Sequence, residues 1–119
     1  MTTPTPTELI AEMFRLSQAL DKGLEYLLDM SREWAEAENA YRQAKAVTFL
    51  AAESNTVAGR QMISDKRCEK ERHRAYMARG QKEAAREAVR ARRTQISALQ
   101  TALNVLKEEM GFSKTGTEW

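Results

Sequence analysis

Proline and glycine are scarce in this chain of 119 residues, which contains two prolines and five glycines. Both prolines lie within the first six residues, so no proline interrupts the rest of the chain. Folds rich in β-strands need many turns, and turns are built largely from these two residue types. The scarcity of turn residues therefore excludes the all-β and α/β classes, and we expect an all-α protein.

Cysteine and histidine are each present once, as Cys68 and His73. A single cysteine excludes an internal disulfide and fits a reducing cytoplasm. One histidine gives too little material for a histidine-based metal site or a catalytic triad, and the sequence has no glycine-rich phosphate loop. We therefore expect a non-enzymatic protein with no catalytic residue, metal, cofactor or small-molecule substrate, and we expect His73 to lie in solvent.

Long apolar runs are absent as well. No run approaches the roughly 18–20 residues that cross a bilayer. The opening MTTPTPTELI lacks the basic and apolar regions of a signal peptide. We expect a soluble, cytoplasmic protein without a membrane partner.

The composition is that of long amphipathic helices, with 42% apolar and 30% charged residues. Thr5 and Glu8 are spaced as a capping box, and Pro6 suits the first position of a helix. Residues 54–56 are Ser, Asn and Thr, whose side chains compete with helix formation, so we expect a turn there. Thr56 is the predicted cap of a second helix.

These signals predict a long antiparallel helical hairpin, similar to a coiled coil, that forms a single domain. Gly111 is expected to end the second helix in a Schellman motif, with Phe112 folding back onto Leu106. The predicted parts are an N-terminal arm (1–6), a first helix (7–53), a turn (54–58), a second helix (59–110) and a flexible tail (111–119).

Apolar residues recur along both helices at steps of three and four, which is the spacing of one helix face. A two-helix hairpin buries only one stripe per helix, so the apolar end of the hairpin needs further partners. We therefore expect a homo-oligomer, of a copy number that the sequence leaves open, assembled at the end away from the turn. The predicted oligomer seam consists of Leu9, Met13, Leu16, Leu20, Leu24, Leu27, Ile96, Leu99, Leu103, Leu106 and Met110.

Charge is distributed unevenly along the chain. Residues 1–59 hold 5 basic and 9 acidic residues, whereas residues 60–93 hold 12 basic and 5 acidic residues. Nine of those 12 basic residues are arginines, whose guanidinium groups suit phosphate binding and base stacking. A basic block of this kind indicates a polyanionic partner.

On a helical wheel at 3.6 residues per turn, five arginines of the second helix fall within about 60° of one another and away from the apolar face. Arg67, Lys70 and Arg74 fall where the apolar face should continue, so we expect this part of the hairpin not to pack as an ordinary core. The predicted nucleic-acid-binding residues are Arg67, Lys70, Arg72, Arg74, Arg79, Lys82, Arg86, Arg90 and Arg93.

A second interpretation of the same residues remains open. Arg74 and Arg79 would lie opposite Glu38 and Glu33 of the first helix, where small residues leave room for the aliphatic stems of arginine. The acidic helix would then neutralise the basic one, and the basic face would meet no nucleic acid.

Three short patterns carry a resemblance to a known family. They are Trp34…Glu38-x-x-Tyr41-x-x-x-Lys45-Ala46, the turn Asn55-Thr56-Val57-Ala58, and Val89-Arg90-Ala91-Arg92-Arg93 leading into Ile96-Ser97-Ala98-Leu99-Gln100. Over residues 30–105 this layout resembles the UvsY-type recombination mediators of double-stranded DNA bacteriophages. Members of that family are helical, form rings, bind single-stranded DNA and help to load a recombinase.

The basic face and the resemblance together predict a bacteriophage-type recombination accessory protein of the host cytoplasm. It would bind single-stranded DNA without sequence preference, with a recombinase or annealing protein as a further partner. The alternative is a non-enzymatic structural or adaptor protein, such as a phage assembly chaperone or an inhibitor of a host protein, acting by protein–protein contact. The sequence leaves the roles of Cys68, His73 and Trp119 open.

Overall fold

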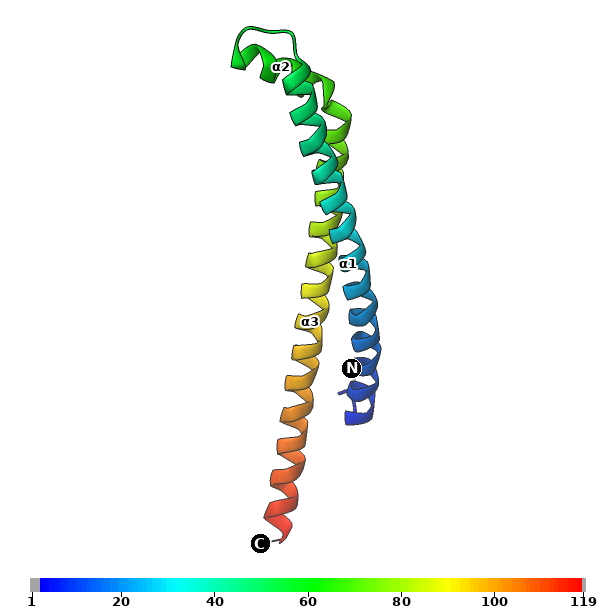
Figure 1. The fold of residues 1–119 in the computed structure, drawn as a ribbon. Helices are drawn as coiled ribbons and strands as arrows, with labels where there is room; N and C mark the ends of the chain where they lie inside the picture. The colour runs from blue at the N-terminus through cyan, green and yellow to red at the C-terminus, as the bar shows by residue number, and fades with distance from the viewer. Residues whose placement is uncertain (1–2, 119) are drawn as a thin grey trace. The chain divides into compact units, whose positions relative to one another are not determined.

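The computed structural model describes residues 3–118, with side chains placed for residues 3–111. This part of the chain forms three helices and no strand: α1 (Pro6–Ala51), α2 (Val57–Arg67) and α3 (Glu69–Glu118) (Figure 1). The predicted all-α fold with a helical hairpin is therefore confirmed. Over the described residues, no helix has a stretch that is both long enough and apolar enough to cross a membrane.

The contacts within the chain divide it into two compact units. The terminal unit joins Met1–Glu25 to Glu87–Trp119, and the turn unit is Tyr26–Arg86. The terminal unit pairs the first part of α1 with the later part of α3. The turn unit contains the rest of α1, all of α2 and the beginning of α3. Each unit is thus built on an antiparallel pairing of α1 with α3.

Helix α1 begins with the predicted capping box. The Glu8 backbone N–H donates to Thr5 Oγ1, and the Thr5 N–H donates to Glu8 Oε2, both at 3.2 Å. These two bonds satisfy backbone donors that the first turn of a helix leaves free. The helix then continues without a break through Gly23, where an added Cβ would lie 3.6 Å from Val89 Cγ2 of α3.

The turn between α1 and α2 is capped as expected. Thr56 is the N-cap of α2, in an extended conformation (φ −116°, ψ 149°), and its hydroxyl accepts a 3.0 Å hydrogen bond from the Gly59 N–H. Before it, the Ser54 N–H donates to the Ala52 carbonyl at 3.1 Å. The Thr56 side chain thus starts α2, whereas the turn before it is closed by a backbone hydrogen bond.

The single second helix predicted over residues 59–110 is divided in the structure. Helix α2 ends at Arg67 and α3 begins at Glu69, with Cys68 between them at φ −102° and ψ 15°. Backbone bonding still crosses this point, because the Cys68 N–H donates to Ser64 O (3.0 Å) and Cys68 O accepts from the Arg72 N–H (2.9 Å). The interruption is therefore a local bend in a hydrogen-bonded helix.

The predicted stop at Gly111 is wrong. Helix α3 continues through Gly111 to Glu118, and no glycine in the described part of the chain has a positive φ. A Schellman stop requires a left-handed residue, so that motif is not formed. The predicted contact of Phe112 with Leu106, and any role of Trp119, lie outside the described side chains.

The two helices face each other through residues at strict steps of three and four, which we call the α1–α3 seam. This spacing is the 3.5-residue repeat of a coiled coil. On α1 the seam contains Leu9, Met13, Leu16, Leu20, Gly23, Leu27, Met30, Trp34, Ala37, Tyr41, Ala44 and Thr48, all buried or half-buried. Opposite these it contains Cys68, between α2 and α3, and the following residues of α3, again buried or half-buried: Glu71, Ala75, Ala78, Lys82, Ala85, Val89, Arg92, Ile96, Leu99, Leu103 and Leu106.

Most residues of the predicted oligomer seam lie in this intrachain seam. Two do not: Leu24 is 37% exposed and Met110 is 59% exposed. Leu24 lies outside the seam because the steps of three and four residues along α1 place Gly23, and not Leu24, at the seam position between Leu20 and Leu27. Met110 is exposed because α1 is too short to cover it. Gly23 lies beside Val89, and the two helices run antiparallel, so the first residue of α1, Pro6, lies opposite about Leu106.

Candidate nucleic-acid interface

The basic residues Arg67, Lys70 and Arg74 lie outside the α1–α3 seam, which corrects the prediction that they interrupt it. All three are exposed, and the seam runs instead through Cys68, Glu71 and the alanines that follow. The error comes from the assumed period. A straight helix drifts by about 20° per heptad from a 3.5-residue repeat, so four heptads shift the predicted face by about 80°.

The turn unit therefore does pack as a core, although a narrow one. Ala37, Ala75 and Ala78 are buried together, and the rings of Trp34 and Tyr41 pack against them. Small side chains in the seam let two helices approach closely, and the two aromatic rings, which belong to the same seam, add apolar contact area. The charge of the neighbouring segment is carried by residues that flank this core.

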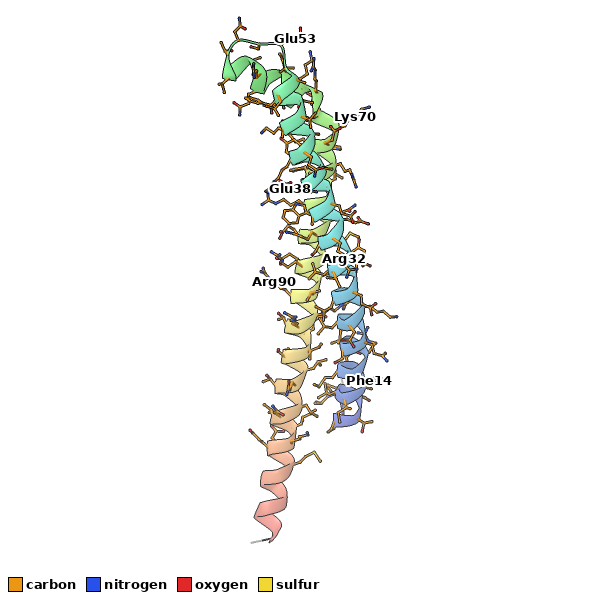
Figure 2. The ribbon with its side chains drawn as sticks, in the orientation of Figure 1. Phe14, Arg32, Glu38, Glu53, Lys70 and Arg90 are labelled. Carbon is orange, nitrogen blue, oxygen red and sulfur yellow. The ribbon has the colours of Figure 1, made fainter. Side chains whose placement is uncertain are left out.

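Six of the predicted basic residues are exposed, and none of their side chains makes a hydrogen bond or an ion pair with any residue that the structure describes. Lys70, labelled in Figure 2, is one of the five that belong to the turn unit. Their charge is not neutralised by the protein itself, so it is available to a partner. The six are Arg67, Lys70, Arg72, Arg74, Arg79 and Arg93.

Two further arginines are paired only with neighbours on their own helix. Arg86 Nη1 lies 3.6 Å from Glu83 Oε2, and Arg90 Nη1 lies 3.0 Å from Glu87 Oε1. Arg90 is also labelled in Figure 2. Exposed pairs of this kind contribute about 0–1 kcal/mol, so a phosphate can replace the glutamate at little cost.

Lys82 does not belong with the exposed basic residues. Its side chain is only 12% exposed, and its Nζ lies 3.9 Å from the ring centroid of Trp34 and 3.5 Å from Glu83 Oε1. Lys82 occupies a seam position, so its charge is held against an aromatic face inside the turn unit. The sequence holds a signal for this position, because steps of four and three residues counted back from Val89 lead to Ala85 and then to Lys82.

The arginines also share one position of the coiled-coil repeat. Arg72, Arg79 and Arg86 follow one another at seven-residue intervals in the turn unit, and Arg93 continues the interval in the terminal unit. Residues seven apart in a 3.5-residue repeat lie on the same face of the helix. α3 therefore carries a row of three arginines beside its seam in the turn unit, and the terminal unit has one arginine, Arg93, at the same position of the repeat.

Internal neutralisation by the acidic helix is limited. Glu38 Oε1 accepts a 3.2 Å hydrogen bond from Arg42 Nε of its own helix. Arg74 lines a shallow groove of about 440 Å³ together with Glu33 and Glu36, but no ion pair joins it to either glutamate. Within residues 3–111, therefore, neither Arg74 nor Arg79 is paired with α1.

A buried polar cluster in the turn unit was missed by the sequence reasoning. Ser64 and Cys68 are its most buried members, and Ser64 Oγ donates to the Lys45 carbonyl at 2.9 Å. Thr48 Oγ1 lies 2.8 Å from Ser64 Oγ and 3.2 Å from Cys68 Sγ. The cluster joins α1 to both sides of the bend, and it leaves Cys68 only 1% exposed.

Among the described side chains, no group of three or more His, Cys, Asp and Glu residues is arranged to hold a metal ion. His73 is exposed, as expected. The chain was also compared with protein-family models, with curated proteins and with solved structures, and none of these comparisons finds a match.

Proposed function

We propose that this protein binds single-stranded DNA without sequence preference through the exposed basic residues of α2 and α3. The observation that carries the proposal is the set of six exposed Arg and Lys side chains that make no ion pair with any described residue. Leaving them unpaired in solvent suits a polyanionic ligand.

Arginine rather than lysine dominates this set, which favours a nucleic acid over an acidic protein. Guanidinium groups bind phosphate oxygens in a planar fork and stack on bases, whereas an ammonium group acts as a point charge. The row along α3 has no base-reading geometry of its own, so binding is directed at the sugar–phosphate backbone and is tolerant of sequence.

We place this activity in a bacteriophage-type recombination accessory protein of the host cytoplasm that acts as a homo-oligomer beside a recombinase or annealing protein. The predicted resemblance to UvsY-type mediators supports this role. Exposed apolar side chains in the terminal unit, of which Phe14 is labelled in Figure 2, support a contact with further protein.

The test is a titration of a fluorescent single-stranded oligonucleotide, read by anisotropy at several salt concentrations. The double variant Arg72→Gln/Arg79→Gln removes two unpaired charges, and Arg32→Gln/Arg42→Gln removes two charges from α1 of the same unit as a matched control. We expect the first variant to flatten the plot of log affinity against log salt by about 0.7 per lost phosphate contact, and the control to leave it unchanged.

The adaptor function is supported by a different observation. In the terminal unit Ile10 and Phe14 are 53% and 67% exposed and lie one turn apart on α1, which is the arrangement of a small protein-binding patch. If the wild-type protein does not bind the oligonucleotide at low salt, the DNA proposal is wrong and this patch becomes the leading site.

A further inference from the structure

Tyr76 is the most exposed tyrosine of the turn unit, with 74% of its surface accessible. On α3 it lies four residues after Arg72 and three residues before Arg79, so the three side chains share one face of the helix. Neither arginine is paired with a described residue. An aromatic ring thus lies in solvent between two cations that no described residue neutralises.

A shallow groove of about 480 Å³ lies beside this ring on α3. Its lining includes the apolar residues Tyr76, Met77 and Ala84 and the cation Arg79. Gly80 opens the groove, because a Cβ at this position would meet no atom within 4 Å. The groove is also lined by Glu83, which has Lys82 and Arg86 within ion-pair distance and is already neutralised.

The other aromatic residues of the unit lack this combination. Trp34 and Tyr41 pack against the buried alanines. Tyr26 is 54% exposed, but its neighbours one turn away on α1 include Asp29 and no arginine. The ring at position 76 is therefore the one exposed aromatic group that stands among unpaired arginines in the described part of the turn unit.

We infer that Tyr76 and the groove over Gly80 form a subsite for one unpaired nucleobase. The base stacks on the tyrosine ring above the glycine, and the phosphates on either side of that nucleotide bind Arg72 and Arg79. This inference rests on the proposed function and adds a base contact to it. Every base has a π-face, so the contact tolerates any sequence, but a base in a duplex is not free to make it.

The experiment compares two ligands of equal charge: a single-stranded oligonucleotide and an abasic oligonucleotide of the same length. Tyr76→Ala is expected to weaken binding of the first by about 5- to 150-fold, the range for loss of one stacked base, and to leave the second unchanged. Tyr76→Phe keeps the ring and should bind as wild type. Tyr26→Ala is the matched control and should also bind as wild type.

A second pair of variants tests the groove. Gly80→Leu fills it with a residue that favours helix, so the fold is retained, and we expect a loss on the normal oligonucleotide similar to that of Tyr76→Ala. Gly80→Ala adds only one methyl group and should bind normally. Circular dichroism verifies that all variants keep the helical content of the wild type.

The possible results separate the subsite from the proposed function. If Tyr76→Ala binds the normal oligonucleotide as tightly as wild type while Arg72→Gln/Arg79→Gln does not, the subsite is wrong and the DNA-binding function stands. Equal losses on both ligands would also overturn a base contact. Normal binding by Gly80→Leu would remove the groove from the subsite. Failure of the wild type to bind either ligand overturns the proposed function itself.

Discussion

The two units use the same pair of helices but bury different kinds of residue. Among the described side chains of the terminal unit, the buried ones are leucines and a valine: Leu9, Leu16, Val89 and Leu103. In the turn unit the buried residues are all small: Ala37, Ala52, Ser64, Cys68, Ala75, Ala78 and Ala85. One unit is stabilised by large aliphatic groups, and the other by close approach of the helices.

This difference explains where the charge can be carried. Leucine side chains in a seam bury much apolar area, at about 25 cal/mol for each Å² removed from water. Alanines bury less, so the turn unit adds aromatic packing, a cation–π contact and hydrogen bonds between Thr48, Ser64 and Lys45. The seam of the turn unit is narrow, and Arg67, Arg72, Arg74 and Arg79 lie on its flanks without a described partner.

The largest expected effect is in the terminal unit. Leu16 is 3% exposed, and Leu16→Ala should lower the free energy of unfolding by about 2–5 kcal/mol through lost burial and a cavity. Urea denaturation followed by circular dichroism measures this. The matched control is Ile10→Ala on the exposed face of the same helix, expected to cost less than about 1 kcal/mol. Equal costs would show that the leucine seam is not the basis of this unit.

Enlarging a buried side chain should destabilise the turn unit. Ala37 is buried between the helices, so Ala37→Leu has no room and should cost about 1–3 kcal/mol through overpacking. Ala35→Leu adds the same atoms at an exposed position of α1 and serves as the control. A stable Ala37→Leu protein with normal helical content would contradict a close-packed alanine seam.

The polar cluster should contribute a smaller amount. Ser64→Ala removes the donor to the Lys45 carbonyl and the contact with Thr48, and we expect a loss of about 1 kcal/mol in thermal or urea denaturation. Thr94→Val is a control, because the Thr94 hydroxyl bonds the Arg90 carbonyl at an exposed site. If Ser64→Ala and Thr94→Val lower the stability by the same small amount, the hydrogen bonds of the cluster do not stabilise the turn unit.

Lys82 separates stability from ligand binding. Lys82→Met keeps the aliphatic stem but removes the charge over Trp34, and it should cost about 0.5–2 kcal/mol of stability. Affinity for single-stranded DNA should stay at the wild-type value, since this lysine is not exposed to a ligand. If Lys82→Met lowers the affinity for single-stranded DNA as much as Arg79→Gln does, Lys82 contacts the ligand and this prediction is wrong.

The smallest expected effect is on an exposed pair of the terminal unit. The hydrogen bonds from Arg15 lower the pKa of the Glu12 carboxyl. A lowered pKa in the folded state stabilises the fold at pH values above the unfolded pKa, and this contribution is lost as the pH falls through the folded value. In an NMR titration, Arg15→Gln should raise the pKa of Glu12 towards its ordinary value. An unchanged pKa would contradict the pairing.

Much of the fold follows from local rules. Three features act within a few residues and have the structural effect that the sequence predicts. They are the capping box of Thr5 and Glu8, the N-cap at Thr56 and the absence of later prolines. The bend at Cys68 could not be predicted in this way. It lies where Ser64 and Cys68 both meet Thr48, a residue of another helix.

The candidate site shows the same limit. The sequence by itself determined that α3 is basic and rich in arginine. Only the packing of α1 against α3 decided which basic residues are free. A coiled-coil pair holds a 3.5-residue repeat that an isolated helix does not have, and the small difference in period moved Arg67, Lys70 and Arg74 out of the seam and brought Lys82 into it.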